Sequence, residues 1–235
     1  MDRIGTAGWS IPRSSAAHFP TEGTGLERYA AVLPAVEINT TFYRSHRPAI
    51  FERWAAATPA DFRFAVKAPK TITHERRLTD AEDLARVFLE QVSPLGDKLG
   101  PVLIQLRPSL SFTPEAAAFV AGWPRLHDGL TALEARHATW FTEDVSGRLA
   151  DARIARVAAD PAVVPEASAP GGWPGLTYIR LHGSPRMYSS PYSTEQIAAV
   201  ARTLAARAPG TEGWGIFDNT MHGAAAANAL TLMAL

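Results

Sequence analysis

The sequence contains no cysteine. This absence excludes disulfide bonds, thiolate nucleophiles and cysteine-ligated zinc. Its 23 basic and 23 acidic residues cancel, so no global field draws the protein to nucleic acid or to an anionic membrane. A nucleic-acid partner is possible through a local basic pocket but is unsupported by net charge. No apolar run approaches the roughly 20 residues that a membrane span requires, so we expect no membrane contact.

Several familiar catalytic motifs are also missing. The chain has no Walker phosphate loop, no Gly-x-Ser-x-Gly elbow, no His-Glu-x-x-His zinc motif and no dinucleotide fingerprint. No apolar segment typical of a signal peptide precedes the first predicted strand. We therefore expect a cytoplasmic protein that uses no cofactor. With 46% hydrophobic residues, its 235 residues suit one domain spanning 1–235.

Eight short apolar or β-branched runs, bordered by turn-forming residues, predict strands. They cover 3–8, 35–40, 62–68, 101–106, 130–136, 154–160, 176–182 and 213–219. Amphipathic helices are predicted between them at 26–33, 48–57, 79–92, 116–122, 141–152 and 197–207, with a last one at 223–235. Capping boxes begin the helices at Thr79 and Ser193, and Thr113 caps a helix before Pro114.

Strands that alternate with helices predict a parallel sheet with right-handed crossovers. Eight such units favour an α/β fold closed into a single (β/α)₈ TIM-type barrel. Residues 161–175 are rich in proline and glycine and show no helical period, so the helix between the sixth and seventh strands is predicted to be missing.

Polar side chains stand at the ends of most predicted strands. In a parallel barrel these ends meet at one mouth, where active sites are built. The candidate site residues at or next to these ends are Glu37, Asn39, Lys67, Gln105, Glu134, Arg136, Asp160, Arg180, His182 and Asn219. The alternative interpretation is a self-neutralising ion network that fills the barrel.

Lys67 ends an apolar strand, where it could clamp an anion, polarise a carbonyl or form a Schiff base. The anion clamp is the favoured role, and a structural pair with Glu37 is the alternative. His182 follows Arg180 on the same strand face, which favours proton transfer. Tyr43 and Tyr188 lie in predicted mouth loops, where they either stack on a ligand or pack within the loop.

The strand-end motifs resemble those of the domain-of-unknown-function family 72, also called the YecE-like family. The resemblance rests on Glu37-Ile38-Asn39-Thr40-Thr41-Phe42-Tyr43, Phe64-Ala65-Val66-Lys67-Ala68-Pro69, Tyr178-Ile179-Arg180-Leu181-His182-Gly183 and Phe217-Asp218-Asn219-Thr220. It implies a TIM-type barrel and supplies no activity. Asp218 stands where similar proteins often have asparagine, which could add a carboxylate near the mouth.

Three hypotheses remain open from the sequence. The first is a metal-independent enzyme that acts on an anionic small molecule bearing phosphate or carboxylate. Lys67, Arg136 and Arg180 would hold the anion. Glu37 or Glu134 would act as general base and His182 would move the proton.

The second is a metal-dependent phosphodiesterase, endonuclease-like or sugar-isomerase-like enzyme, whose metal ligands would be Glu37, Glu134, Asp160 and His182. The third is a non-catalytic module that binds a metabolite or nucleotide.

Overall fold

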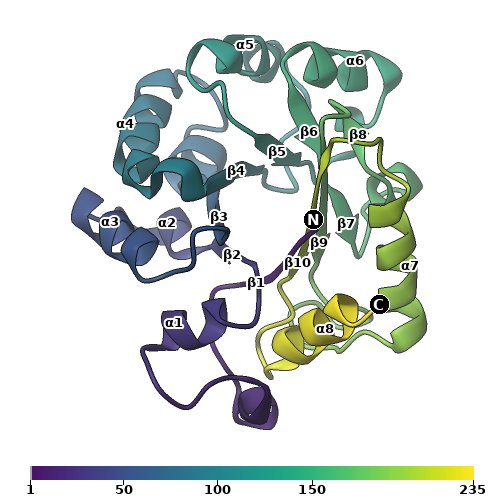
Figure 1. Ribbon diagram of the computed structural model, residues 1–235. Coiled ribbons are helices and arrows are strands. Elements are labelled where there is room, and N and C mark those ends of the chain that lie inside the picture. The colour runs from purple at the N-terminus through teal and green to yellow at the C-terminus, as the bar shows by residue number, and fades with distance from the viewer. Residues whose placement is uncertain (1) are drawn as a thin grey trace.

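The computed structural model describes residues 2–235. Its strands form one sheet in the order β7-β9-β10-β1-β2-β3-β4-β5-β6-β8. The strands are β1 (Arg3–Ala7), β2 (Ala35–Ile38), β3 (Arg63–Lys67), β4 (Leu99–Gln105), β5 (Thr131–Glu134), β6 (Ile154–Arg156), β7 (Ala158–Asp160), β8 (Gly171–Gly172), β9 (Leu176–Leu181) and β10 (Glu212–Phe217). All pairings are parallel except that of β8 with β6. Figure 1 shows the strands curving into a nearly closed barrel.

The predicted barrel is confirmed, including the pairing of β1 with both β2 and β10. The segment predicted as one strand at 154–160 is broken at Val157. Its first half, β6, pairs with β5, and its second half, β7, pairs with β9. The segment therefore contributes one strand near each end of the strand order, beside β5 and beside β9, and brings the two ends of the sheet together.

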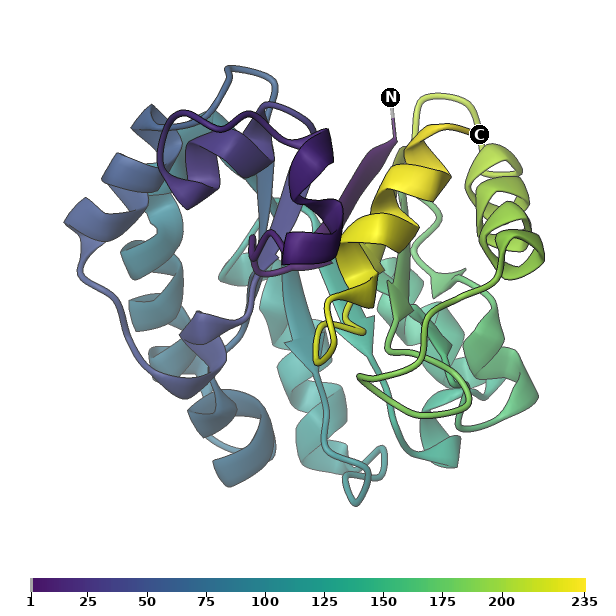
Figure 2. The ribbon, with the colours of Figure 1, turned by 90° about the horizontal axis from the view of Figure 1, so that it is seen from below.

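Helices surround the strands, as Figures 1 and 2 show. They are α1 (Gly25–Ala30), α2 (Thr40–Tyr43), α3 (Pro48–Ala56), α4 (Glu82–Val92), α5 (Pro114–Gly122), α6 (Glu143–Asp151), α7 (Thr194–Ala205) and α8 (Ala224–Met233). Of the described residues between β7 and β9, none forms an α-helix; only the 3₁₀ turn η6 (Pro165–Ser168) and the short β8 lie there. The predicted loss of this helix is confirmed. No helix within residues 2–235 has the length and apolar character of a membrane span.

Two of the three predicted helix starts are confirmed. Ser193 and Gln196 form the reciprocal capping box of α7, and Thr113 caps α5 ahead of Pro114. The capping box predicted at Thr79 is wrong, because α4 begins at Glu82 with Ala81 as its N-cap and without a side-chain cap. Asp80, which would be the first helical residue after a cap at Thr79, has a left-handed φ of 47° where the box would need right-handed helical backbone.

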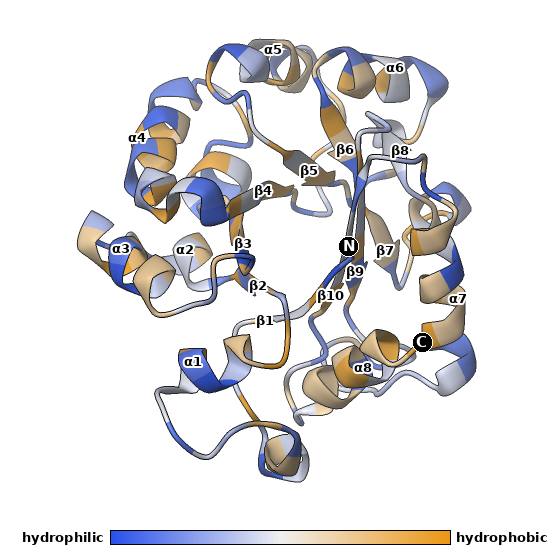
Figure 3. Cartoon of the chain, viewed as in Figure 1, coloured by the Kyte–Doolittle hydropathy of each residue, from blue (hydrophilic) through white to orange (hydrophobic). Residues whose placement is uncertain are grey.

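Large and small side chains alternate across the lower part of the barrel. The Trp214 and Tyr178 rings stack with centroids 5.9 Å apart. A Cβ at Gly100 would lie 2.6 Å from the Trp214 ring, so glycine makes room for it. Opposite strands contribute mainly alanines to this layer. In Figure 3 the strands are predominantly orange, while blue residues lie on the surrounding helices.

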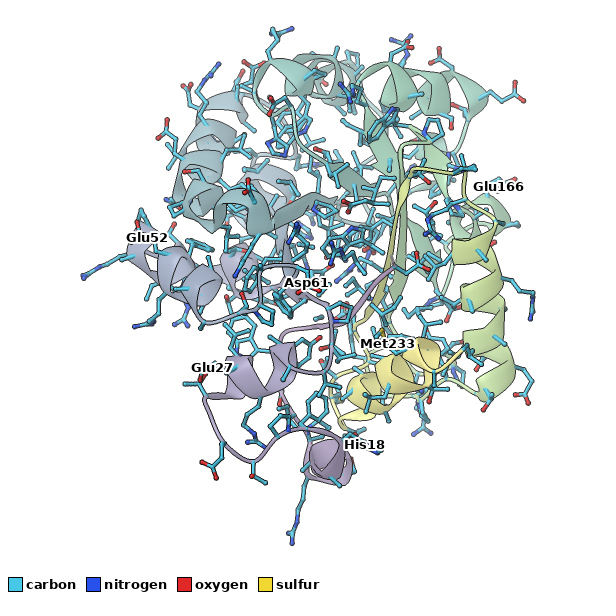
Figure 4. All side chains as sticks on the ribbon, in the orientation of Figure 1. His18, Glu27, Glu52, Asp61, Glu166 and Met233 are labelled. Carbon is cyan, nitrogen blue, oxygen red and sulfur yellow. The ribbon has the colours of Figure 1, made fainter. Side chains whose placement is uncertain are left out.

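The layer above these aromatic rings, at the carboxyl ends of the strands, is polar. Strand alternation places its members two residues beyond the apolar layer, so that Glu37 follows Ala35 and Arg180 follows Tyr178. Figure 4 shows side chains filling the interior of the barrel, whereas Glu27 and Glu52 lie at the periphery. The fold thus closes the base of the barrel with apolar groups and concentrates charge beneath the mouth.

Candidate functional site

Arg180 is the centre of a buried ion-pair network. Its Nε and Nη2 donate to the two oxygens of Glu37 at 2.9 and 2.7 Å. Its Nη1 donates to Glu134 at 2.6 Å, and Nη2 also donates to Asp218 at 3.0 Å. Burial alone would lower the pKa of Arg180, but the three carboxylates raise it well above its usual range. The guanidinium is therefore permanently charged and fully engaged by protein groups.

Glu134 accepts hydrogen bonds from several donors. Besides Arg180, Gln105 Nε2 lies 3.0 Å from Oε1, and Arg136 Nε lies 2.8 Å from the same oxygen. Burial would raise the pKa of Glu134, but Arg180, His182 and Arg136 together hold it well below its usual range. Glu37 is similarly occupied, since Tyr178 donates to it at 2.8 Å in addition to Arg180. Both carboxylates are held in place by their donors.

His182 lies between two carboxylates. Its Nε2 is 3.1 Å from Glu134 and its Nδ1 is 3.1 Å from Asp218. Burial and the nearby Arg180 guanidinium lower the pKa of His182, but Glu134 and the hydrogen bonds to both carboxylates raise it above its usual value. The two carboxylates favour an imidazolium that donates from both ring nitrogens, while Nε2 also lies 3.3 Å from Arg180 Nη1 and 3.4 Å from Arg136 Nη2.

Lys67 differs from these groups because its charge is not paired. The residue is 7% exposed, yet its ammonium forms no ion pair and donates no hydrogen bond to any described residue. Its Nζ lies 4.2 Å from the centre of the Phe42 ring. Burial, and secondarily Arg180, lower the pKa of Lys67 to about 8. The predicted alternative of a Glu37–Lys67 pair is wrong, since Glu37 is held by Arg180.

The wall beside Lys67 is aromatic and cationic. The His74 ring meets the Phe42 ring edge-on at 4.9 Å, and Arg107 donates to the His74 carbonyl at 3.3 Å. Burial lowers the pKa of His74, and Lys67, Arg107 and Arg136 lower it further. His74 is therefore neutral in a cationic surrounding.

The formal charges of the network can be counted directly. The network contains the carboxylates Glu37, Glu134 and Asp218 and the cations Lys67, Arg136 and Arg180, so these six charges cancel. Protonated His182 adds one positive charge. The pairing is uneven, since Arg180 binds all three carboxylates and leaves Lys67 with none.

The structure brings most of the predicted site residues together. Those in the network or in contact with it are Glu37, Lys67, Gln105, Glu134, Arg136, Arg180 and His182. Tyr188 lies edge-on to the His182 ring at 5.7 Å. Asn39 follows Glu37 at the end of β2; its side-chain oxygen is buried and accepts no hydrogen bond from the described residues.

Three predicted residues lie elsewhere. Asp160 accepts a hydrogen bond from the Tyr192 hydroxyl at 2.6 Å on the outer side of β7. Asn219 donates to the Ser190 carbonyl at 2.9 Å and is buried behind β10. Tyr43 is 72% exposed, and its ring lies edge-on to the Phe42 ring with centroids 4.9 Å apart. Asp160 and Asn219 fall outside because alternate residues of a strand face opposite sides.

Sequence reasoning did not place Asp218 among the site residues, although it is an integral member of the network. The signal was available in the alternation of β10, because Trp214 and Ile216 face the barrel interior and Asp218 continues the same face. Phe42 was also passed over in favour of its neighbour Tyr43. Only the chain path of α2 decides which of the two rings faces Lys67.

The metal-ligand set predicted as an alternative does not assemble. Asp160 is bonded outside the barrel, while Glu37 and Glu134 are both held by Arg180. Within residues 2–235, no three histidine, aspartate or glutamate side chains group in a way that could hold a metal ion.

Nearly the whole described chain matches one protein family. The model of the family "Protein of unknown function DUF72" matches residues 3–235. The chain belongs to this family. The UPF0759 protein YecE of Escherichia coli K12 is 39% identical over 106 residues, which are 45% of this chain and 38% of that protein. The UPF0759 protein YunF of Bacillus subtilis is 29% identical over 150 residues, covering 60% of this chain and 53% of that protein. The matches thus span about half or less of the length of these curated relatives.

Crystal structures of two DUF72 family proteins share the fold. The protein from Enterococcus faecalis superposes with a TM-score of 0.83 at 24% identity, covering 100% of this chain and 94% of the other. The protein from Thermotoga maritima gives a TM-score of 0.82 at 25% identity, covering 100% and 98%. These structures share the barrel fold with this chain, and their descriptions name no activity.

Proposed function

We propose that this barrel is an enzyme that binds a small anionic substrate at its mouth and transfers a proton without a metal. The observation that carries the proposal is Lys67, a residue only 7% exposed whose ammonium forms no ion pair with a carboxylate of the described residues. A buried charge without a partner is costly, so an anionic ligand that supplies the missing partner would be bound strongly.

Arg136 is the second cation that we expect to bind the anionic substrate. Its Nε is engaged by Glu134, while its side chain retains 18% exposure at the upper side of the network. Arg180 was expected to share this role, but it is 0% exposed and bonded to three carboxylates. Its contribution is instead to fix Glu37, Glu134 and Asp218 in position.

His182 is the proton donor in this proposal. Glu134 and Asp218 face its two ring nitrogens and stabilise the imidazolium form. The carboxylates expected to act as general base are poorly suited to it, since Glu37 and Glu134 already accept several charged hydrogen bonds. They orient the cations and the imidazole.

Thermal unfolding with added phosphate tests the binding step. Phosphate should raise the melting temperature relative to chloride at equal ionic strength. Lys67→Met should abolish the rise. Lys70→Met is the matched control, because Lys70 is half-exposed and paired with Glu75 at 3.0 Å. The absence of any phosphate effect, together with strong stabilisation by a divalent cation, would replace this proposal with the metal-dependent alternative.

Catalysis needs a second measurement. Mass spectrometry of the small molecule that co-purifies with the protein should reveal an anion, and incubation with that compound should give turnover. Turnover that is lost in His182→Gln while binding persists supports proton transfer. Binding without any turnover in the wild type would identify a non-catalytic module instead.

A further inference from the structure

A small pocket opens beside the ion-pair network, between the ends of β5 and β7 and the loops that follow β7 and β9. Its volume is about 100 Å³. The polar groups in its lining are Glu134, Arg136 and His182. The rest of its wall is apolar and includes Ala135, Ala159, Pro161, Val163, Ala167 and Met187. We refer to this cavity as the side pocket.

The side pocket adjoins the groups that the proposed function assigns to the substrate. Arg136 and His182 line it directly. The acceptor oxygens of Glu134 are taken up by Arg180, Arg136 and Gln105. A ligand whose anionic group binds Arg136 would therefore not be repelled by a free Glu134 carboxylate at the inner end of the pocket. The rest of the ligand would contact the apolar walls.

The entrance carries apolar side chains that remain in water. Val163 is 50% exposed and Met187 is 42% exposed, and they belong to the loops after β7 and β9. An apolar group that entered between them would remove both side chains and itself from water, which is favourable at about 25 cal/mol per Å² of apolar surface.

We infer that the side pocket binds a short aliphatic part of the substrate, whose carboxylate or phosphate lies on Arg136, the cation that lines the pocket. This inference rests on the proposed function and adds the substrate class: a small amphiphilic anion rather than a sugar phosphate or a bare inorganic ion. An apolar cavity of about 150 Å³ holds benzene, so the side pocket suits a chain of about four carbons.

Binding of a homologous series of carboxylates tests the inference. Acetate, butyrate and hexanoate are titrated at equal ionic strength by calorimetry. Affinity should rise about threefold to fourfold per methylene as far as about four carbons and then level off, because each buried methylene contributes about that factor. An affinity that does not depend on chain length overturns the inference.

A variant that fills the pocket locates the effect. Val163→Trp should retain acetate binding and lose the dependence on chain length. Val87→Trp is the matched control, since Val87 is 51% exposed on α4, away from the mouth, and should behave as wild type. Met187→Trp obstructs the same pocket from the other loop and serves if Val163→Trp does not fold. Chain-length dependence that survives in a folded pocket variant overturns the inference.

The outcomes separate this inference from the proposed function. If acetate and phosphate bind and Lys67→Met abolishes that binding, but chain length has no effect, the proposed function stands and the side pocket has another occupant. If no anion binds at all, both fail.

Discussion

Arg180 on β9 and Glu37 on β2 form a two-point ion pair across the interior of the barrel, with N–O distances of 2.9 and 2.7 Å. Both side chains are 0% exposed. Such a pair needs both partners, because removing one leaves the other buried and uncompensated. The pair therefore links stability to the geometry of the site.

Replacing Arg180 should destabilise the protein severely. Arg180→Met leaves three carboxylates without their shared cation, and we expect the free energy of unfolding to fall by about 3–5 kcal/mol in urea titrations. Glu37→Gln should cost less, because Arg180 keeps Glu134 and Asp218. Arg148→Met, which breaks an exposed helical pair with Asp144, should change little. Equal stability of the Arg180 and Arg148 variants would contradict the central role of the network.

Lys67 should make stability depend on alkaline pH. Below about pH 8 the lysine is charged in the folded and the unfolded states, and its buried charge disfavours folding. Between pH 8 and 10.5, the ordinary pKa of a lysine side chain, the folded protein has released the proton while the unfolded chain still holds it. The free energy of unfolding should therefore rise with pH in this window, by about 3 kcal/mol in total.

Comparison with Lys67→Met isolates this effect. The variant lacks the titrating group, so the stability of the wild type relative to the variant should improve as the pH rises from 8 to 10.5. Urea unfolding at several pH values measures this difference. A difference that stays constant across the window would show that Lys67 titrates normally.

His182 should hold its proton to higher pH than the other shifted histidines. Its pKa is raised, whereas burial lowers the pKa of His127, His46 and His74. The stability that His182 contributes through its carboxylates is therefore complete below about pH 6.5 and is lost as the pH rises through the folded pKa. NMR titration of the imidazole carbons should show His182 deprotonating after the other three. Earlier deprotonation would remove its assignment as proton donor.

Two aspartates offer a direct contrast between the inner and outer faces of the strands. Asp218→Asn removes a negative charge from the network and should tighten phosphate binding while lowering the pKa of His182. Asp160→Asn changes only a hydrogen bond with Tyr192 outside the barrel and should leave phosphate binding unchanged. Calorimetric titration with phosphate distinguishes them. An equal effect of both substitutions would contradict the observed strand faces.

The order of elements was readable from the sequence because hydrophobic period and turn residues are local properties. The apolar run at Val102-Leu103-Ile104 and the cap at Ser193 each reflect a few neighbouring residues. The strand break at Val157 could not be predicted from the sequence. It depends on tertiary pairing, because the first half of the segment hydrogen-bonds to β5 and the second half to β9. The left-handed turn at Asp80 likewise depends on how the chain approaches α4.

The sequence by itself determined the barrel and the end at which the polar groups gather, because strand alternation and parallel topology follow from residue patterns. The tertiary structure alone decided how the charges are shared. Arg180 reaches Glu37, Glu134 and Asp218, and Lys67 is left without a carboxylate. Such pairing depends on distances of a few ångströms between side chains from strands far apart in the chain. At low dielectric those distances decide which charged side chain has an oppositely charged partner.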